Sequence, residues 1–74
     1  MKLSTVNVIE YVDDSVIGVS SFTDDEEGNK EASNLFGRCA KANGATDKDL
    51  KDYALEDGMY ECGTYQVFIA HSIN

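Results

Sequence analysis

The chain has 74 residues, of which 42% are hydrophobic and 27% charged, and it contains no proline. A chain this short encloses one hydrophobic core, so we expect a single domain over residues 1–74, with too little core to spare for the deep pocket of an enzyme. Fourteen acidic and six basic residues give a formal charge of −8, which repels nucleic-acid phosphates and anionic membranes but attracts lysine- and arginine-rich surfaces.

The first two predicted elements are strands over residues 3–12 and 15–22. Both runs are rich in β-branched and aromatic side chains, which is typical of strands. Only Asp13 and Asp14 separate them. Aspartate tolerates the positive φ angles of a two-residue hairpin loop, although Asn-Gly or Asp-Gly would be a stronger turn signal. The chain therefore begins with a predicted β-hairpin.

A helix is predicted next, because apolar residues change to helical spacing and form one stripe of Ala32, Leu35, Phe36, Cys39 and Ala40. Thr23 and Glu26 have the spacing of a capping box, which favours a start at the acidic run 24–27. Gly28 disfavours that start, and the alternative is a loop over 24–27 with a helix from about Asn29. Asn43 and Gly44 form the predicted stop.

The last third of the chain predicts a short helix and a second hairpin. Thr46 is the expected N-cap of the helix, which presents Leu50, Tyr53 and Ala54 on one face and ends before Gly58. Strands over residues 59–62 and 64–72 follow, with a turn at Gly63.

Two hairpins separated by helices predict a two-layer α+β fold. The economical arrangement is a four-stranded antiparallel sheet, in the order strand-strand-helix-helix-strand-strand, with the helices on one face. In the last strand Phe68 and Ala70 alternate with Tyr65, Val67 and Ile69, so apolar side chains point to both sides. That strand is expected to be central, or the open face of the sheet meets a partner.

The chain offers little chemistry for catalysis or metal binding. One histidine, His71, and two distant cysteines, Cys39 and Cys62, predict no zinc site and no disulfide framework, and we expect both thiols to be free. Residues 47–57 superficially resemble a calcium loop but lack its glycine. The glycines form no nucleotide motif. We expect no cofactor, no metal and no catalytic residue.

Neither a membrane span nor a signal peptide is expected. No apolar run approaches the roughly 20 residues of a span, and the first four residues lack the apolar segment of a signal peptide. These features predict a cytoplasmic protein.

The carboxylates supply the candidate partner-binding residues. One group lies at the start of the long helix, and the other follows i, i+3, i+7 spacing on the short helix, with side-chain roots about 5 to 6 Å apart. Such a row approximates the spacing of phosphates along a DNA strand. The alternative is a solvated helix face with ion pairs between Asp47 and Lys51 and between Lys48 and Asp52. The candidates are Asp24, Asp25, Glu26, Glu27, Asp49, Asp52 and Glu56.

In length, acidity and these carboxylate runs, the chain resembles small acidic proteins of phages and mobile elements, among them anti-CRISPR proteins that imitate DNA. The resemblance includes no shared motif, so no functional residue is carried over. It implies a non-catalytic inhibitor that occupies the basic DNA channel of a CRISPR effector, such as a Cascade-type complex.

Two other functions compete with DNA mimicry. One is a small protein-binding or regulatory module that uses the open sheet face, and the other is an enzyme that pairs His71 with Cys39 or Cys62. Mimicry requires a continuous anionic band, whereas the module requires an apolar patch with aromatic anchors. The enzyme requires a thiol within hydrogen-bond reach of the imidazole.

Overall fold

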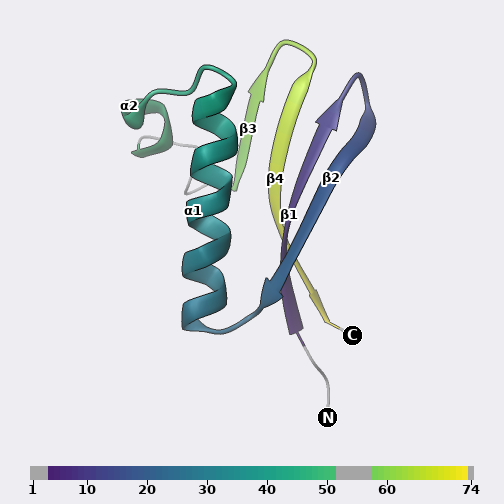
Figure 1. Ribbon diagram of the computed structural model, residues 1–74, viewed down its shortest axis with the longest axis vertical. Coiled ribbons are helices and arrows are strands. Elements are labelled where there is room, and N and C mark those ends of the chain that lie inside the picture. The colour runs from purple at the N-terminus through teal and green to yellow at the C-terminus, as the bar shows by residue number, and fades with distance from the viewer. Residues whose placement is uncertain (1–3, 52–57, 74) are drawn as a thin grey trace.

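The strands and helices follow one another in the predicted order. A computed structural model describes residues 4–51 and 58–73 of the chain. The elements are β1 (Ser4–Val12), β2 (Ser15–Thr23), α1 (Glu26–Ala42), α2 (Asp47–Asp49), β3 (Met59–Cys62) and β4 (Tyr65–Ile73). The strands form one antiparallel sheet in the order β2-β1-β4-β3, with both helices on the same side (Figure 1). The predicted α+β fold is confirmed.

The first hairpin turn is as short as the sequence predicted, whereas the second contains both Gly63 and Thr64, one residue more than predicted. Asp13 and Asp14 have φ angles of 51° and 64° and connect the paired residues Val12 and Ser15, which is the backbone pattern of a type I′ turn. In the second hairpin Gly63 has a φ of 61°. A backbone hydrogen bond from Asp13 N to Thr64 O, at 3.1 Å, joins the two hairpin tips.

Strand β2 contains a β-bulge. Glu10 pairs with Gly18 and Tyr11 pairs with Val16, so Ile17 has no partner on β1. An extra residue of this kind increases the local twist of an edge strand, which makes further strand pairing along that edge less favourable.

The start of α1 corrects the sequence prediction. The N-cap is Asp25, not Thr23, because the Asp25 carboxylate accepts a hydrogen bond of 2.7 Å from the backbone N–H of Gly28. The alternative start near Asn29 is also wrong, since Glu26 and Glu27 are helical. Gly28 belongs here because a Cβ atom at this position would lie 1.7 Å from the carbonyl oxygen of Thr23. The tight connection from β2 into α1 therefore requires a glycine.

The predicted helix signals around residues 43–49 are confirmed. Gly44 follows α1 with a φ of 101°, as expected of a left-handed stop. Thr46 and Asp49 form a reciprocal capping box at α2, which is one of the commonest ways to begin a helix. Tyr53 and Ala54, the rest of the predicted apolar face, lie outside the described residues.

The core lies between α1 and the sheet. Phe36, Ala32 and Ala40 of α1 are fully buried, while Leu35 and Cys39 are partly buried against the same core. The predicted packing of the apolar stripe is thus confirmed, as is the internal position of β4. The sheet contributes Val6, Val8, Tyr60, Tyr65 and Val67 to this core.

Candidate functional site

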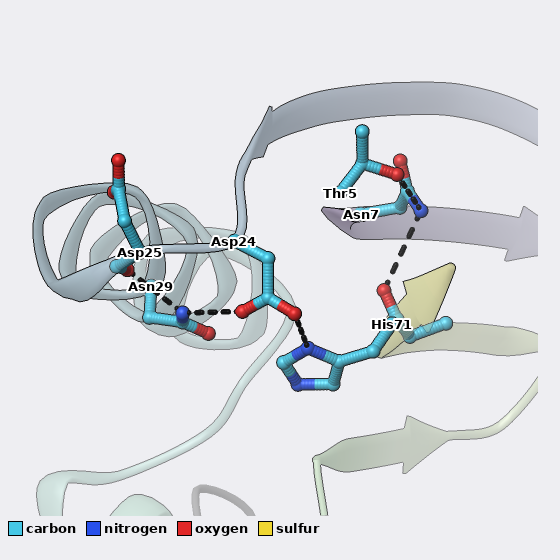
Figure 2. Close-up of polar contacts among 7 residues, drawn as sticks. Thr5, Asn7, Asp24, Asp25, Asn29 and His71 are labelled. Atoms are coloured by element: carbon cyan, nitrogen blue, oxygen red, sulfur yellow. Dashed lines mark hydrogen bonds and ion pairs between the residues drawn. The ribbon is translucent and has the colours of Figure 1, made fainter. Parts of the chain in front are cut away.

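The acidic run at the start of α1 is partly used by the fold itself. Asp24 accepts a 2.7 Å hydrogen bond from the side-chain amide of Asn29 and lies 3.3 Å from Nδ1 of His71 (Figure 2). The Asn29 bond, followed by the His71 contact, holds the pKa of the Asp24 carboxyl below its usual value. Asp25 is the N-cap. These two carboxylates position the β2–α1 connection and the last strand.

The other two carboxylates of the run remain available to a partner. Glu26 and Glu27 are exposed in the first turn of α1, and Glu31 is exposed one turn later. Glu27 and Glu31 border a groove of about 540 Å³ between α1 and the ends of β1 and β2. A helix N-terminus favours negative charge, so this acidity also has a purely structural explanation.

Of the second predicted carboxylate row, only Asp49 lies within the described residues. Asp49 is half-buried and its carboxylate accepts a 3.0 Å hydrogen bond from the backbone N–H of Thr46. Asp52 and Glu56 lie outside the described residues. Asp47 forms an ion pair with Lys41 of α1, where the sequence suggested Lys51 as its partner.

A small polar cluster lies where α1 meets the sheet. The Tyr65 hydroxyl donates a hydrogen bond of 2.7 Å to the Glu10 carboxylate, and the Cys39 thiol lies beside both groups. Burial and the Glu10 carboxylate raise the pKa of Tyr65 above its usual value, and burial also raises the pKa of the Cys39 thiol. A thiol of raised pKa is a poor nucleophile at neutral pH.

His71 is not part of that cluster. Its imidazole contacts Asp24 at the opposite end of α1 (Figure 2). Both cysteines are free, as expected, with Cys62 exposed. Within residues 4–51 and 58–73, no three histidine, cysteine or carboxylate side chains gather as metal ligands, and none of the helices there is long and apolar enough to cross a membrane.

The most distinctive surface is the sheet face that the helices leave open. Because alternate residues of a strand point to opposite faces, the register places one continuous row across all four strands: Val19, Ile9, Phe68 and Met59. Val19 is 60% exposed and Met59 40% exposed. We call this face, completed by Tyr11 and Val16, the open apolar face.

The centre of the open apolar face is aromatic and slightly concave. The rings of Tyr11 and Phe68 meet edge to face, with centroids 5.6 Å apart and planes at 89°. A hollow of about 380 Å³ borders both rings, and its other walls are Ile9, Asp14, Gln66, Ile69 and Ala70.

The two ends of the open apolar face differ chemically. Toward the hairpin tips lie Asp14, at the hollow, and Glu61, which accepts a 2.8 Å hydrogen bond from Gln66. At the other end, Asn7 accepts a 2.6 Å hydrogen bond from the Ser21 hydroxyl and donates to Thr5, the latter visible in Figure 2. One end is thus acidic and the other is a neutral network of amide and hydroxyl groups.

The sequence predicted that an open sheet face could meet a partner, and of its residues the alternation in the last strand indicated only Phe68 and Ala70. The available signal was that Ile9 and Tyr11 alternate with Val6 and Val8, so β1 is apolar on both sides, as β4 is. A strand covered on one face only would carry polar residues on the other.

Comparison with known proteins finds no matching family model, no matching curated protein and no matching solved structure.

Proposed function

We propose that this protein is a non-catalytic protein-binding module that docks through the open apolar face. The observation that carries the proposal is the apolar row of Val19, Ile9, Phe68 and Met59 across all four strands. Val19 and Met59 at its ends are exposed, while Ile9 and Phe68 between them are half-buried. Exposed apolar patches on small proteins that are rimmed by polar groups mark sites of protein interaction.

The aromatic pair suits the role of an anchor. Tyr11 and Phe68 each have few rotatable bonds, and their edge-to-face contact orders both rings before any partner arrives. Such rigid aromatic side chains lose little conformational entropy on docking and are frequent among the residues that dominate binding energy.

Docking by this face can be tested by comparing the proteins that are captured by two variants, each of which carries two substitutions. Val16→Thr/Val19→Thr keeps side-chain volume but adds hydroxyls to the face, whereas Glu26→Gln/Glu31→Gln alters only α1. We expect the first variant to lose a partner retained by the second, in low and in high salt, since apolar contacts resist screening. Equal capture by both variants would contradict the proposal.

The second candidate function is the acidic inhibitor that imitates DNA, of the anti-CRISPR type, acting in the cytoplasm. The observation that favours it is the −8 charge together with the exposed carboxylates of Glu26, Glu27 and Glu31. These side chains would contact the Lys/Arg-rich groove of a CRISPR effector that normally holds DNA.

The two functions make opposite predictions in one assay. If the protein imitates DNA, it competes with DNA for a Cascade-type effector, and Glu26→Gln/Glu27→Gln/Glu31→Gln weakens competition while Val16→Thr/Val19→Thr does not. No competition, or equal competition by the glutamine variant, would rule out mimicry by these carboxylates. Loss of competition in the threonine variant would instead assign the effector to the open apolar face.

A further inference from the structure

The charges around the open apolar face indicate which kind of protein surface it fits. Its acidic end carries Asp14 and Glu61, and Asp13 is exposed beside them in the hairpin turn. None of the four strands, within the bounds given above, contains a lysine or an arginine. The described lysine and arginine residues lie in α1 and α2, apart from Lys51, which follows α2.

This separation of charge disfavours a second copy of the chain as the occupant. Two open apolar faces in contact would bring the carboxylates of both copies into one interface that has no lysine or arginine on either sheet to pair with them. Buried or partly buried carboxylates without partners are costly. Each copy also carries a charge of −8.

The size of the face leads to the same conclusion. A nine-residue strand is roughly 30 Å long, and four strands spaced by about 4.8 Å are roughly 15 to 19 Å wide. Since β3 has only four residues, the flat area is at most on the order of 500 Å², below the roughly 800 Å² per partner of a standard interface and far below that of obligate dimers. An interface this small needs favourable charges at its rim to be specific.

We propose that the occupant is a different protein whose docking surface has an apolar centre and a cluster of lysine or arginine side chains on one side only. The apolar centre packs on Tyr11, Phe68 and Val19, and the cations meet Asp14 and Glu61. The neutral Asn7 end faces uncharged polar groups. This inference rests on the proposed function, and it adds the chemistry of the partner and its direction along the strands.

The test uses a library of random displayed peptides selected on the immobilised full chain. Binding of the selected peptides is then measured for three variants: Val16→Thr/Val19→Thr, Asp14→Asn/Glu61→Gln and the control Glu26→Gln/Glu31→Gln. Asparagine tolerates the positive φ of the turn at residue 14. The second and third variants lose the same net charge, so they separate the rim of the face from the general field of the protein.

We expect peptides that combine apolar residues with lysine or arginine on one side. Their affinity should fall about tenfold in the threonine variant and about fivefold or more in Asp14→Asn/Glu61→Gln, with less than twofold change in the control. Equal weakening in the rim variant and the control would overturn the inference, because only net charge would matter.

Other outcomes separate the inference from the proposed function. Peptides that need Val16 and Val19 but not Asp14 and Glu61 would overturn the basic partner and leave the docking face intact. Selection of no peptide that depends on Val16 and Val19 would overturn both. Sedimentation that shows a dimer, abolished in the threonine variant, would assign the face to a second copy and overturn the inference.

Discussion

The two faces of the sheet are built from the same strands and from similar residues, yet they have opposite surroundings. On the helix side, Val6, Val8 and Val67 are 2% exposed or less, because α1 lies over them. On the other side, Val16 and Val19 are more than half exposed. Figure 1 shows why: both helices lie to the left of the sheet, and no described element crosses its right side.

This contrast shows that apolar composition alone does not define a core in so small a domain. One helix of 17 residues covers one face, and no helix of the described residues lies over the other. The covered face stabilises the fold. The exposed face carries similar side chains without that benefit, and such a patch is typical of a binding surface.

The strongest test of the contrast replaces one phenylalanine on each side. Phe36 is fully buried between α1 and the sheet, so Phe36→Ala should lower the free energy of unfolding by about 3 to 5 kcal/mol and leave the chain largely unfolded. Phe68→Ala, on the open apolar face, should cost only about 1 kcal/mol, chiefly the edge contact with Tyr11. Urea titration of both variants would measure the difference, and similar losses would contradict the assignment of the two faces.

A second comparison concerns two glycines of α1. Gly28→Ala should cost about 3 kcal/mol, because the new Cβ would overlap the carbonyl oxygen of Thr23 and force the β2–α1 connection apart. At Gly37 a Cβ would make an ordinary contact of 3.7 Å with Leu50. Gly37→Ala should therefore stabilise the protein by up to about 1 kcal/mol through helix propensity alone. Thermal unfolding of both variants shows whether each substitution lowers or raises the stability. A Gly28→Ala variant as stable as the wild type would refute the close approach of Gly28 to Thr23.

A smaller effect is expected at the polar cluster on the covered face. Tyr65→Phe removes the hydroxyl that donates to Glu10 and should cost about 1.5 kcal/mol. Because burial and the Glu10 carboxylate raise the pKa of Tyr65 in the folded state above the ordinary value of about 10, the stability from this phenol is complete below about pH 10 and is lost as the pH rises further.

The free energy of unfolding should therefore fall less steeply with rising pH in Tyr65→Phe than in the wild type. Denaturant midpoints measured from pH 8 to pH 11 give the slope. The half-buried Tyr11 offers a matched control, since Tyr11→Phe removes a hydroxyl from the other face of the sheet. An unchanged slope in Tyr65→Phe would show that the hydrogen bond to Glu10 does not contribute.

The elements of this fold could be predicted because their signals are local. The Asp13-Asp14 turn, the apolar stripe around Phe36 and the capping box at Thr46 each depend on residues within a few positions of one another. The helix start was misplaced by two residues because Asp25, like Thr23, is a good N-cap. Only the close approach of Gly28 to Thr23 in three dimensions decides between them.

The candidate site could not be predicted in the same way because it is made by strand register. Val19 and Met59 share a row through Ile9 and Phe68, and no sequence spacing reveals that alignment. The contact between Asp24 and His71 spans 47 positions. The predicted site was therefore the set of carboxylates, whose charge is visible in any order. Of the open apolar face, the alternation in the last strand indicated only Phe68 and Ala70.

The variant with the largest expected effect on binding, Val16→Thr/Val19→Thr, should have the smallest effect on stability. In Val16→Thr/Val19→Thr, each threonine keeps the shape and the β-propensity of valine, and its hydroxyl can hydrogen-bond to water because both positions are more than half exposed. The free energy of unfolding should change by less than about 0.5 kcal/mol. Denaturant titration measures this value, with Val6→Thr as the buried control that should cost about 1 to 3 kcal/mol.

The same hydroxyls become costly only when a partner removes their water. A docked apolar surface would leave them without hydrogen-bond partners, so the threonine variant should fold as the wild type does and bind worse. A marked loss of stability in this variant would mean that Val16 and Val19 are covered in the isolated protein. The open apolar face would then belong to the core, and the contrast between the two faces would disappear.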